Sequence, residues 1–214
     1  MNYSDGALRE GALWDLIGRS GHENVRQRTV QSMQKRFHVN QAQANRVKEC
    51  ALAMLDQVEK DWKLPSTARK WLLWAAELHE VGLSITHHQF QKHGAYLVLH
   101  SDMAGFTNQG QELLAVLLKG HRRKFPLAGI EGLSVMVRQQ ARYLCLLLRL
   151  AAVLNNSRGA VELPEIEYQG KADTLTLIFP KDWFKQHPLT KDDLRVEADY
   201  LKAAGLTLIV AEDT

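Results

Sequence analysis

His79 and Glu80 are the sharpest chemical signal in the sequence, because a histidine and a carboxylate stand side by side where a helix is expected to end. An imidazole nitrogen and a carboxylate oxygen at one helix end can both reach a divalent transition-metal ion beside that turn. Two ligands make half a site, so other segments would have to supply the rest. The nearby histidines are His87, His88, His93, His100 and His121.

The same pair also has a structural interpretation. His79 can form a hydrogen bond across a bundle of helices, and Glu80 can pair with an arginine such as Arg46 or Arg149. On spacing alone, this structural role is favoured over metal binding.

A second signal is the basic segment Lys119–Lys124, in which five of six residues can be cationic. Guanidinium forks bind phosphate oxygens in pairs, and lysine adds a point charge. Polyphosphate, a nucleotide or a nucleic acid would suit such a segment. Aromatic residues are not interleaved with these charges, which argues against single-stranded nucleic acid. The alternative is that the charges simply complement the dipole of the preceding helix.

Hydrophobic periodicity predicts the helices that must position these side chains. His79 and Glu80 would end a helix that begins at Pro65 and stops by Gly82. The basic segment would follow a helix over residues 108–119, with Thr107 or Asn108 as its cap and Gly120 in a turn after its end. Further helices are predicted over residues 5–19, 23–37, 40–58 with Asn40 as the cap, 89–100 and 133–156. The last is apolar on nearly every side, so it is expected in the centre of a bundle. Its Arg142 and Arg149 lie seven residues apart, on either a solvated edge or an inward functional face.

The pattern changes after Gly159, where strands are predicted over residues 165–169, 174–179 and 206–210, with a helix capped by Thr190 between the last two. The predicted fold is therefore mainly α, a helical domain followed by a small α+β domain. Residues 159–214 hold six Lys or Arg against eleven Asp or Glu, which gives this part a formal net charge of −5. Because the whole chain has a net charge of +3, residues 1–158 carry +8. A basic body with an acidic end favours an anionic ligand for the first part, or else two parts that attract each other.

Composition is that of an ordinary globular protein, with 45% hydrophobic and 24% charged residues. This balance excludes a disordered tail, a collagen-like fibre and a coiled coil. No apolar run reaches membrane-spanning length and no signal pattern opens the chain, so a cytoplasmic protein is expected. Cys50 and Cys145 are expected to be core residues rather than a disulfide. The sequence has no G-x-S-x-G elbow, no Walker-type loop and no G-x-G-x-x-G.

Several blocks in a fixed order resemble the C-terminal half of the Ppx/GppA family, the exopolyphosphatases and guanosine pentaphosphate phosphatases. The blocks are His79–Gly82, His93–Leu97, Asp102–Thr107 and His121–Arg123. Also similar are Gly6–Gly11, Arg26–Thr29, Leu148–Ala151, Leu154–Asn156 and Phe179–Phe184. The joint order of these blocks is much more specific than any one of them.

The resemblance implies a remnant of an upstream actin-like catalytic region over residues 1–20, a helical domain like the HD phosphohydrolases over 21–158 and a small α+β domain over 159–214. In the family, hydrolysis belongs to that upstream region, so this chain is expected to be a natural or engineered fragment without catalytic residues. Mg²⁺ is expected for the complete parent and no cofactor for this chain. The implied role is to bind polyphosphate or pppGpp beside the upstream domain and to support a homodimer, with neither membrane nor nucleic acid as a partner.

Departures from the HD pattern bear on activity. Gln43 (or Asn45) falls near the first ligand position, His79 and Glu80 replace the His-Asp pair, and Asn155 stands near the last. Neutral amides are weak metal ligands, so no metal is expected. The predicted phosphate ligands are His121, Arg122, Arg123 and Lys124, with Arg69 and Lys70 as further candidates. Two alternatives stay open, a metal-dependent HD-type phosphohydrolase that uses His79 and Glu80, and a module for oligomerisation only.

Overall fold

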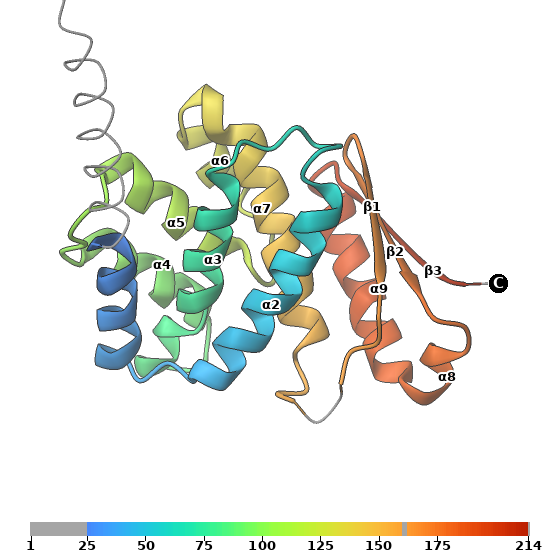
Figure 1. Cartoon of the computed structure of the whole chain (residues 1–214). Helices are drawn as coiled ribbons and strands as arrows, with labels where there is room; N and C mark the ends of the chain where they lie inside the picture. The colour runs from blue at the N-terminus through green and yellow to red at the C-terminus, as the bar shows by residue number, and fades with distance from the viewer. Residues whose placement is uncertain (1–24, 160–161, 214) are drawn as a thin grey trace, which may run out of the picture.

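Helices form the described chain as far as Leu154, in a computed structural model that describes residues 25–159 and 162–213 (Figure 1). Residues 25–36 are helical. The following helices are α2 (Gln41–Val58), α3 (Ala68–Leu78), the 3-10 turn η1 (Val81–Ser84), α4 (Phe90–His100), α5 (Asn108–Gly120), α6 (Leu127–Gly132) and α7 (Val135–Leu154). The predicted helix over residues 5–19 and the predicted remnant over 1–20 lie outside the described residues.

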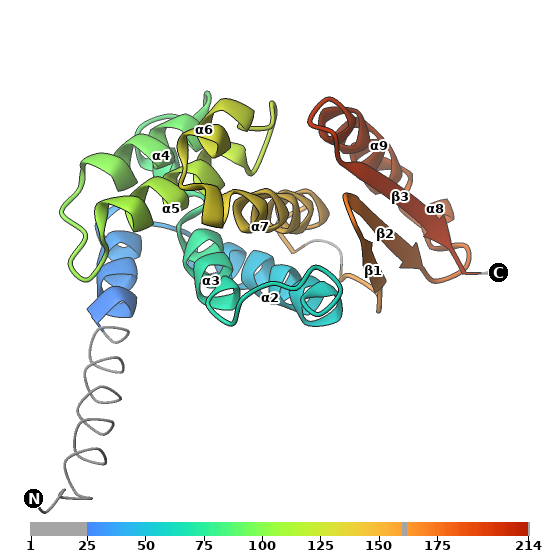
Figure 2. The same cartoon turned by 90° about the horizontal axis from the view of Figure 1, so that it is seen from above.

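Helix α7 occupies the centre of the molecule, as its apolar sequence predicts. Its residues from Gln140 to Ala151 are almost all buried, and it packs against α2, α3, α5 and α9. Figure 2 shows α7 between the layer of helices on one side and α9 with the sheet on the other. This central position places the last turn of α7 between the two parts of the fold.

Two predicted helix caps are confirmed by hydrogen bonds. Asn40 accepts from the backbone N–H of Gln43 at 3.0 Å, and Thr107 accepts from Gly110 N–H at 3.2 Å. The start of α3 differs, because residues 65–67 form a turn and the helix begins at Ala68. Each cap satisfies one of the N–H groups that a helix start leaves without a partner.

Gly82 does not stop a helix but permits a close approach of two segments. Helix α3 ends at Leu78, and Gly82 lies within η1. A Cβ atom at Gly82 would lie 2.5 Å from the backbone nitrogen of Gly94 and closer still to the carbonyl oxygen of Phe90. A glycine at this position therefore lets α4 pack directly against the turn that follows His79 and Glu80.

The C-terminal part is a three-stranded sheet with two helices between its second and third strands. Strands β1 (Glu167–Lys171) and β2 (Thr174–Phe179) pair antiparallel, and β2 pairs parallel with β3 (Thr207–Glu212). Short α8 (Trp183–Gln186) and α9 (Pro188–Lys202) connect the two parallel strands. Alternate residues of β2, namely Leu175, Leu177 and Phe179, are buried, as a half-buried strand requires. Helix α9 begins at Pro188, two residues before the predicted cap Thr190.

The predicted fold class, mainly α with a small α+β part, is confirmed. Both cysteines are free, and burial raises the pKa of Cys50 and of Cys145 to about 12, which keeps both thiols protonated. Among the described helices, none is both long enough and apolar enough to cross a membrane.

Candidate functional site

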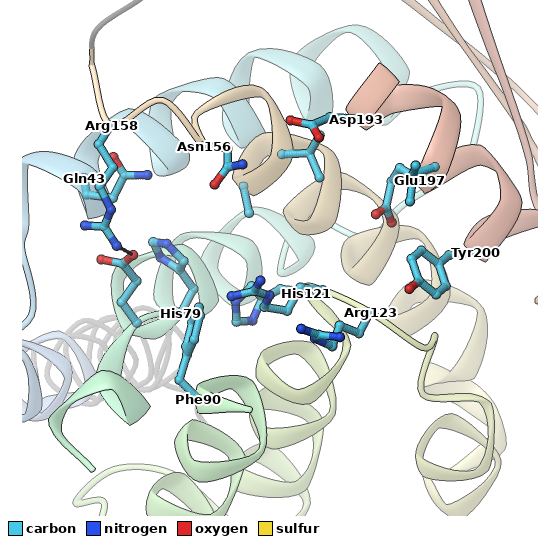
Figure 3. A pocket seen from close by; sticks show the side chains of 15 residues that line it. Gln43, His79, Phe90, His121, Arg123, Asn156, Arg158, Asp193, Glu197 and Tyr200 are labelled. Carbon is cyan, nitrogen blue, oxygen red and sulfur yellow. Dashed lines mark hydrogen bonds and ion pairs between the residues drawn. The ribbon is translucent and has the colours of Figure 1, made fainter. Parts of the chain in front are cut away.

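A pocket of about 300 Å³ lies where the C-terminal ends of α3, α5 and α7 meet one face of α9 (Figure 3). Helix ends converge here because α3 and α5 both pack against α7, and α9 packs against α7 from the opposite part of the fold. The end of α3 supplies His79 and Glu80, and the end of α5 supplies His121, Arg122 and Arg123. The two sequence signals, forty residues apart, therefore line one pocket.

His79 and His121 are equivalent in their local structure, since each is the C-cap of its helix. The Nδ1 atom of His79 lies 2.7 Å from the carbonyl oxygen of Ala76, and the Nδ1 atom of His121 lies 2.6 Å from that of Leu118. The two rings are perpendicular, with centroids 5.5 Å apart, and both are almost completely buried. Each imidazole thus satisfies a carbonyl that the helix end would otherwise leave free. The hydrogen bond of His79 to Ala76 therefore stays within its own helix and does not cross the bundle as expected.

These contacts fix the state of both rings. A carbonyl oxygen only accepts, so Nδ1 must carry the hydrogen in each histidine. Burial lowers the pKa of His79 and lowers that of His121 still further, the latter with help from His79, Arg122 and Arg149. The rings are therefore neutral at pH 7 and present Nε2 as an acceptor. Nε2 of His121 is buried and has no hydrogen-bond partner.

Glu80 is held by Arg158, which follows α7. The guanidinium of Arg158 donates to Oε1 of Glu80 at 2.5 Å, while Oε2 is buried without a partner. The structural interpretation of Glu80 as an arginine partner is thus confirmed, but Arg158 takes the place of the expected Arg46 or Arg149. Arg158 has a positive φ of 54°, a conformation that costs about 1–3 kcal/mol in a non-glycine residue. The ion pair with Glu80 helps to hold it there.

The other two positions of the degenerate HD pattern lie next to each other. Nε2 of Gln43 donates to the carbonyl oxygen of Asn155 at 2.9 Å, and Oε1 of Gln43 accepts from Arg46 at 2.6 Å. The Asn155 side chain donates to Ala151 and does not line the pocket. Both ends of the Gln43 amide are therefore engaged. In the described ranges, no three His, Cys, Asp or Glu side chains are grouped so that they can hold a metal ion.

Arg122 and Arg123 form the basic rim of the pocket. The guanidinium of Arg122 lies over the Phe90 ring, 4.9 Å from its centroid, and partial burial lowers the pKa of Arg122. Arg123 has a positive φ of 60°. Neither guanidinium forms an ion pair with any residue in 25–159 or 162–213. Both cations are exposed and available to an anion.

Arg149 lies buried behind this rim and holds its backbone in place. It is fully buried and donates to the carbonyl oxygens of Gly120 at 2.5 Å and Arg123 at 2.6 Å, and to the carboxylate of Glu197. Burial raises the pKa of Glu197, and the neighbouring Arg149 opposes that rise. Of the two interpretations that the sequence allowed for the Arg142 and Arg149 stripe, the inward one applies to Arg149. Its role as a support was not predicted, because one isolated arginine in an apolar helix does not reveal its partners.

Helix α9 forms the opposite wall of the pocket with Asp193, Val196, Glu197 and Tyr200. Figure 3 shows Glu197 and Tyr200 facing the pocket from this helix, with Arg123 near Tyr200. None of these four α9 residues was predicted from the sequence to belong to the site. The spacing in α9 predicts only an amphipathic helix, and the side of α7 on which it packs depends on the tertiary fold.

The remaining predicted phosphate ligands do not line the pocket. Lys124 is exposed next to the rim. Arg69 and Lys70 lie in the first turn of α3, at the opposite end of that helix from His79, and Arg69 pairs with Asp56. The structure thus brings His121, Arg122 and Arg123 together with His79 and Glu80, and leaves Arg69 and Lys70 elsewhere.

Comparison with protein families gives one match that covers most of the chain. The family model described as Ppx/GppA phosphatase, domain III, matches residues 25–198. The matched segment runs from the helix over residues 25–36 through most of α9, so it includes every residue that lines the pocket except Tyr200. The chain therefore belongs to the Ppx/GppA phosphatase family, and what it carries is that family's domain III.

Proposed function

We propose that this domain binds phosphate-rich anions, polyphosphate or pppGpp, at the pocket between α5, α7 and α9, and that it performs no hydrolysis itself. The observation that carries the proposal is the basic rim, in which Arg122 and Arg123 have no ion-pair partner among the described residues. Guanidinium groups bind phosphate oxygens in a two-point geometry that lysine cannot match.

The charges around the pocket support an anionic ligand at the basic rim, because the buried carboxylates of the pocket are paired. Glu80 is paired with Arg158 and Glu197 with Arg149, so these carboxylates repel a phosphate less than free ones would. Asp193, exposed on α9, is the pocket carboxylate without an ion pair in the described part of the chain. Attraction between unit charges near a protein surface reaches about 4 kcal/mol at 4 Å, and the two guanidinium groups outnumber the single carboxylate without an ion pair.

The proposal is tested by titrating the protein with long-chain polyphosphate and with pppGpp in low salt. Arg122→Ala combined with Arg123→Ala is expected to weaken binding at least tenfold. The matched control is Arg36→Ala combined with Lys60→Ala, which removes the same charge from exposed positions that do not line the pocket. An equal loss of affinity in both double variants would show that only the net charge matters. No loss in either variant would show that the basic rim does not bind the anion.

A single Arg69→Ala variant tests the further candidates on α3. Because Arg69 already pairs with Asp56 far from the pocket, its removal is expected to leave the affinity for polyphosphate unchanged within twofold. A loss as large as that of Arg122→Ala would instead extend the binding surface to the start of α3.

The metal-dependent phosphohydrolase remains the alternative for His79 and Glu80. The cation that Glu80 binds is the guanidinium of Arg158, and both ends of the Gln43 amide are engaged, so the donor set fits a metal poorly. Elemental analysis of the purified protein separates the two proposals. A stoichiometric ion that is lost in His79→Ala, together with phosphate release, would favour the enzyme.

Homodimer formation is a separate proposal that rests on the family resemblance. Sedimentation at several salt concentrations tests it, and the expected species is a dimer at micromolar concentration. A dimer that dissociates as salt rises, in a protein that binds no anion, would favour a module for oligomerisation only, since its basic and acidic parts would then pair between subunits.

A further inference from the structure

We infer that the pocket selects a phosphate group that binds together with a proton, and that Nε2 of His121 shares this proton. Such a phosphate is a chain end or a phosphomonoester rather than an interior phosphate. The inference rests on the proposed function, because it refines which phosphate the same site accepts. It is carried by a buried acceptor that the protein itself does not satisfy.

The acceptor character of Nε2 follows from the contact on the other side of the ring. Nδ1 of His121 donates to the carbonyl oxygen of Leu118 at 2.6 Å, so Nε2 of the neutral imidazole carries a lone pair. His121 is 1% exposed, and buried polar atoms in folded proteins nearly always have a partner. A lone pair without one therefore marks a place for a ligand that donates.

None of the groups around His121 supplies that donor. His79, at the end of α3, presents its own Nε2 as an acceptor because its Nδ1 is engaged with Ala76. Phe90 of α4 offers only its ring. The charged or titratable groups that face the site are Glu80 after α3, Arg122 and Arg123 after α5, Arg149 and Arg158 on or after α7, and Asp193, Glu197 and Tyr200 on α9.

These groups divide the pocket into two chemical zones. Arg122 and Arg123 at the rim donate hydrogen bonds. On the floor, Nε2 of His121 and Oε2 of Glu80 are buried acceptors without partners. Figure 3 shows both imidazoles in the middle of the pocket, between Arg158 on one side and Arg123 on the other. A complementary ligand must accept at the rim and donate at the floor.

A terminal phosphate meets both requirements, whereas an interior phosphate does not. The second proton of a terminal phosphate leaves with a pKa of about 6, so at pH 7.5 the free ligand has lost part of it. On binding, one oxygen takes this proton up again for the contact with His121 while the other oxygens accept. An interior phosphate of a chain has lost its only proton and accepts alone. The shared proton can reside on the phosphate oxygen or on Nε2 of His121. In either arrangement one proton enters the site with the ligand.

Calorimetry with two small phosphates tests this inference on the whole chain. Linear tripolyphosphate has two ends, whereas cyclic trimetaphosphate has the same number of phosphates and no end. Titrations at pH 7.5 in two buffers with different ionisation enthalpies give the number of protons taken up. Tripolyphosphate is expected to bind at least tenfold more tightly and with uptake of up to one proton, and trimetaphosphate with none.

The matched variant is His121→Asn, since the asparagine amide can still donate to Leu118 while the Nε2 acceptor is lost. Because the two ligands also differ in net charge, the decisive quantity is the proton uptake rather than the ratio of affinities. His121→Asn is expected to abolish the uptake with tripolyphosphate. If this variant does not fold, the ¹⁵N shift of Nε2 in the native protein answers the same question. It is expected to move with tripolyphosphate and to stay in place with trimetaphosphate.

The outcomes separate this inference from the proposed function. Binding of both ligands with no proton uptake, or with uptake unchanged in His121→Asn, would overturn the inference and leave anion binding at the rim intact. Failure of tripolyphosphate, trimetaphosphate and long-chain polyphosphate alike to bind the native protein would overturn both.

Discussion

Arg149 is the residue on which the geometry of the basic rim depends. Its planar guanidinium donates in three directions, to Gly120, Arg123 and Glu197, and so ties the end of α5 to α7 and α9. Lysine has no such fixed fork of donors. Because Arg123 has a positive φ, the bond from Arg149 to its carbonyl oxygen also helps to hold that strained conformation.

Replacing this residue should therefore be costly. Arg149→Met is expected to lower the free energy of unfolding by about 3–5 kcal/mol, since it leaves the Glu197 carboxylate buried without its partner. Urea denaturation measures the change. Arg149→Met combined with Glu197→Leu removes both charges and is expected to recover part of the loss. A single variant within about 1 kcal/mol of the native protein would show that this network does not support the fold.

The two buried histidines predict how stability depends on pH. Their pKa values are lowered in the folded protein from 6.5, so below that pH the unfolded chain binds protons that the folded chain does not. The free energy of unfolding should fall as the pH drops from 7 to 5, by up to about 1.4 kcal/mol per pH unit for each histidine. Glu197, whose pKa is raised, contributes with the opposite sign just above pH 4.5.

Urea denaturation at pH 5–8 checks this dependence. His121→Asn removes one of the two groups, so its stability should be lower at pH 8 but decline less steeply toward pH 5 than that of the native protein. Parallel curves for the two proteins would contradict the lowered pKa of His121.

At the scale of elements, close approach between helices determines where the rim begins. Gly120 is the last residue of α5, and a Cβ atom there would lie 2.6 Å from Cγ of Pro126 and closer still to Sγ of Cys145 on α7. Sequence reasoning assigned Gly120 to a turn after the helix. The structure shows instead that a small residue is needed so that α5 can contact α7.

A pair of glycine substitutions tests this explanation. Gly120→Ala is expected to destabilise the protein by about 1–3 kcal/mol through overpacking. Gly132→Ala is the control, because no atom lies within 4 Å of its added Cβ, and it should be neutral or slightly stabilising. Thermal unfolding of both variants gives the comparison, and equal melting temperatures would argue against a tight contact at Gly120.

Local sequence patterns predicted most of the elements and few of the contacts between them. Asn40 and Thr107 mark helix starts through bonds to residues three positions away, so the sequence alone reveals them. The apolar surface of α7 likewise predicts a central helix. By contrast, α6 and α8 are short and lack a clear period, and α9 begins at Pro188 rather than after Thr190.

The candidate site follows the same division. The residue types of His79, Glu80, Arg122 and Arg123 could be recognised from the sequence as candidates for ligand binding, and the structure brings them together. Arg158 was missed because its partner Glu80 is 78 residues away in the sequence. Contacts over such separations depend on how the helices pack, which periodicity does not encode.

At the scale of the whole molecule, the pocket lies between the basic helical part and the acidic C-terminal part. An anion at the rim is attracted by the former, and α9 of the latter limits the pocket on its other side. Attraction of this kind weakens with ionic strength, because exposed charges are screened over about 8–10 Å at physiological salt.

The salt dependence of binding follows from this arrangement. The slope of log Kd against log salt for long polyphosphate is expected to fall by about 0.7 for each guanidinium removed, as for a flexible single-stranded polyanion. Measurement on the native protein and on Arg122→Ala with Arg123→Ala gives the difference. An unchanged slope would mean that these two cations make no contact with phosphate.

The most direct test of the account is to locate bound polyphosphate by NMR on the ¹⁵N-labelled protein. The backbone amides of residues 120–124 and of Arg158 are expected to show the largest shifts, with little change at Arg69 and Lys70. Shifts confined to the start of α3, or spread evenly over all exposed lysines and arginines, would contradict a phosphate site between α5, α7 and α9.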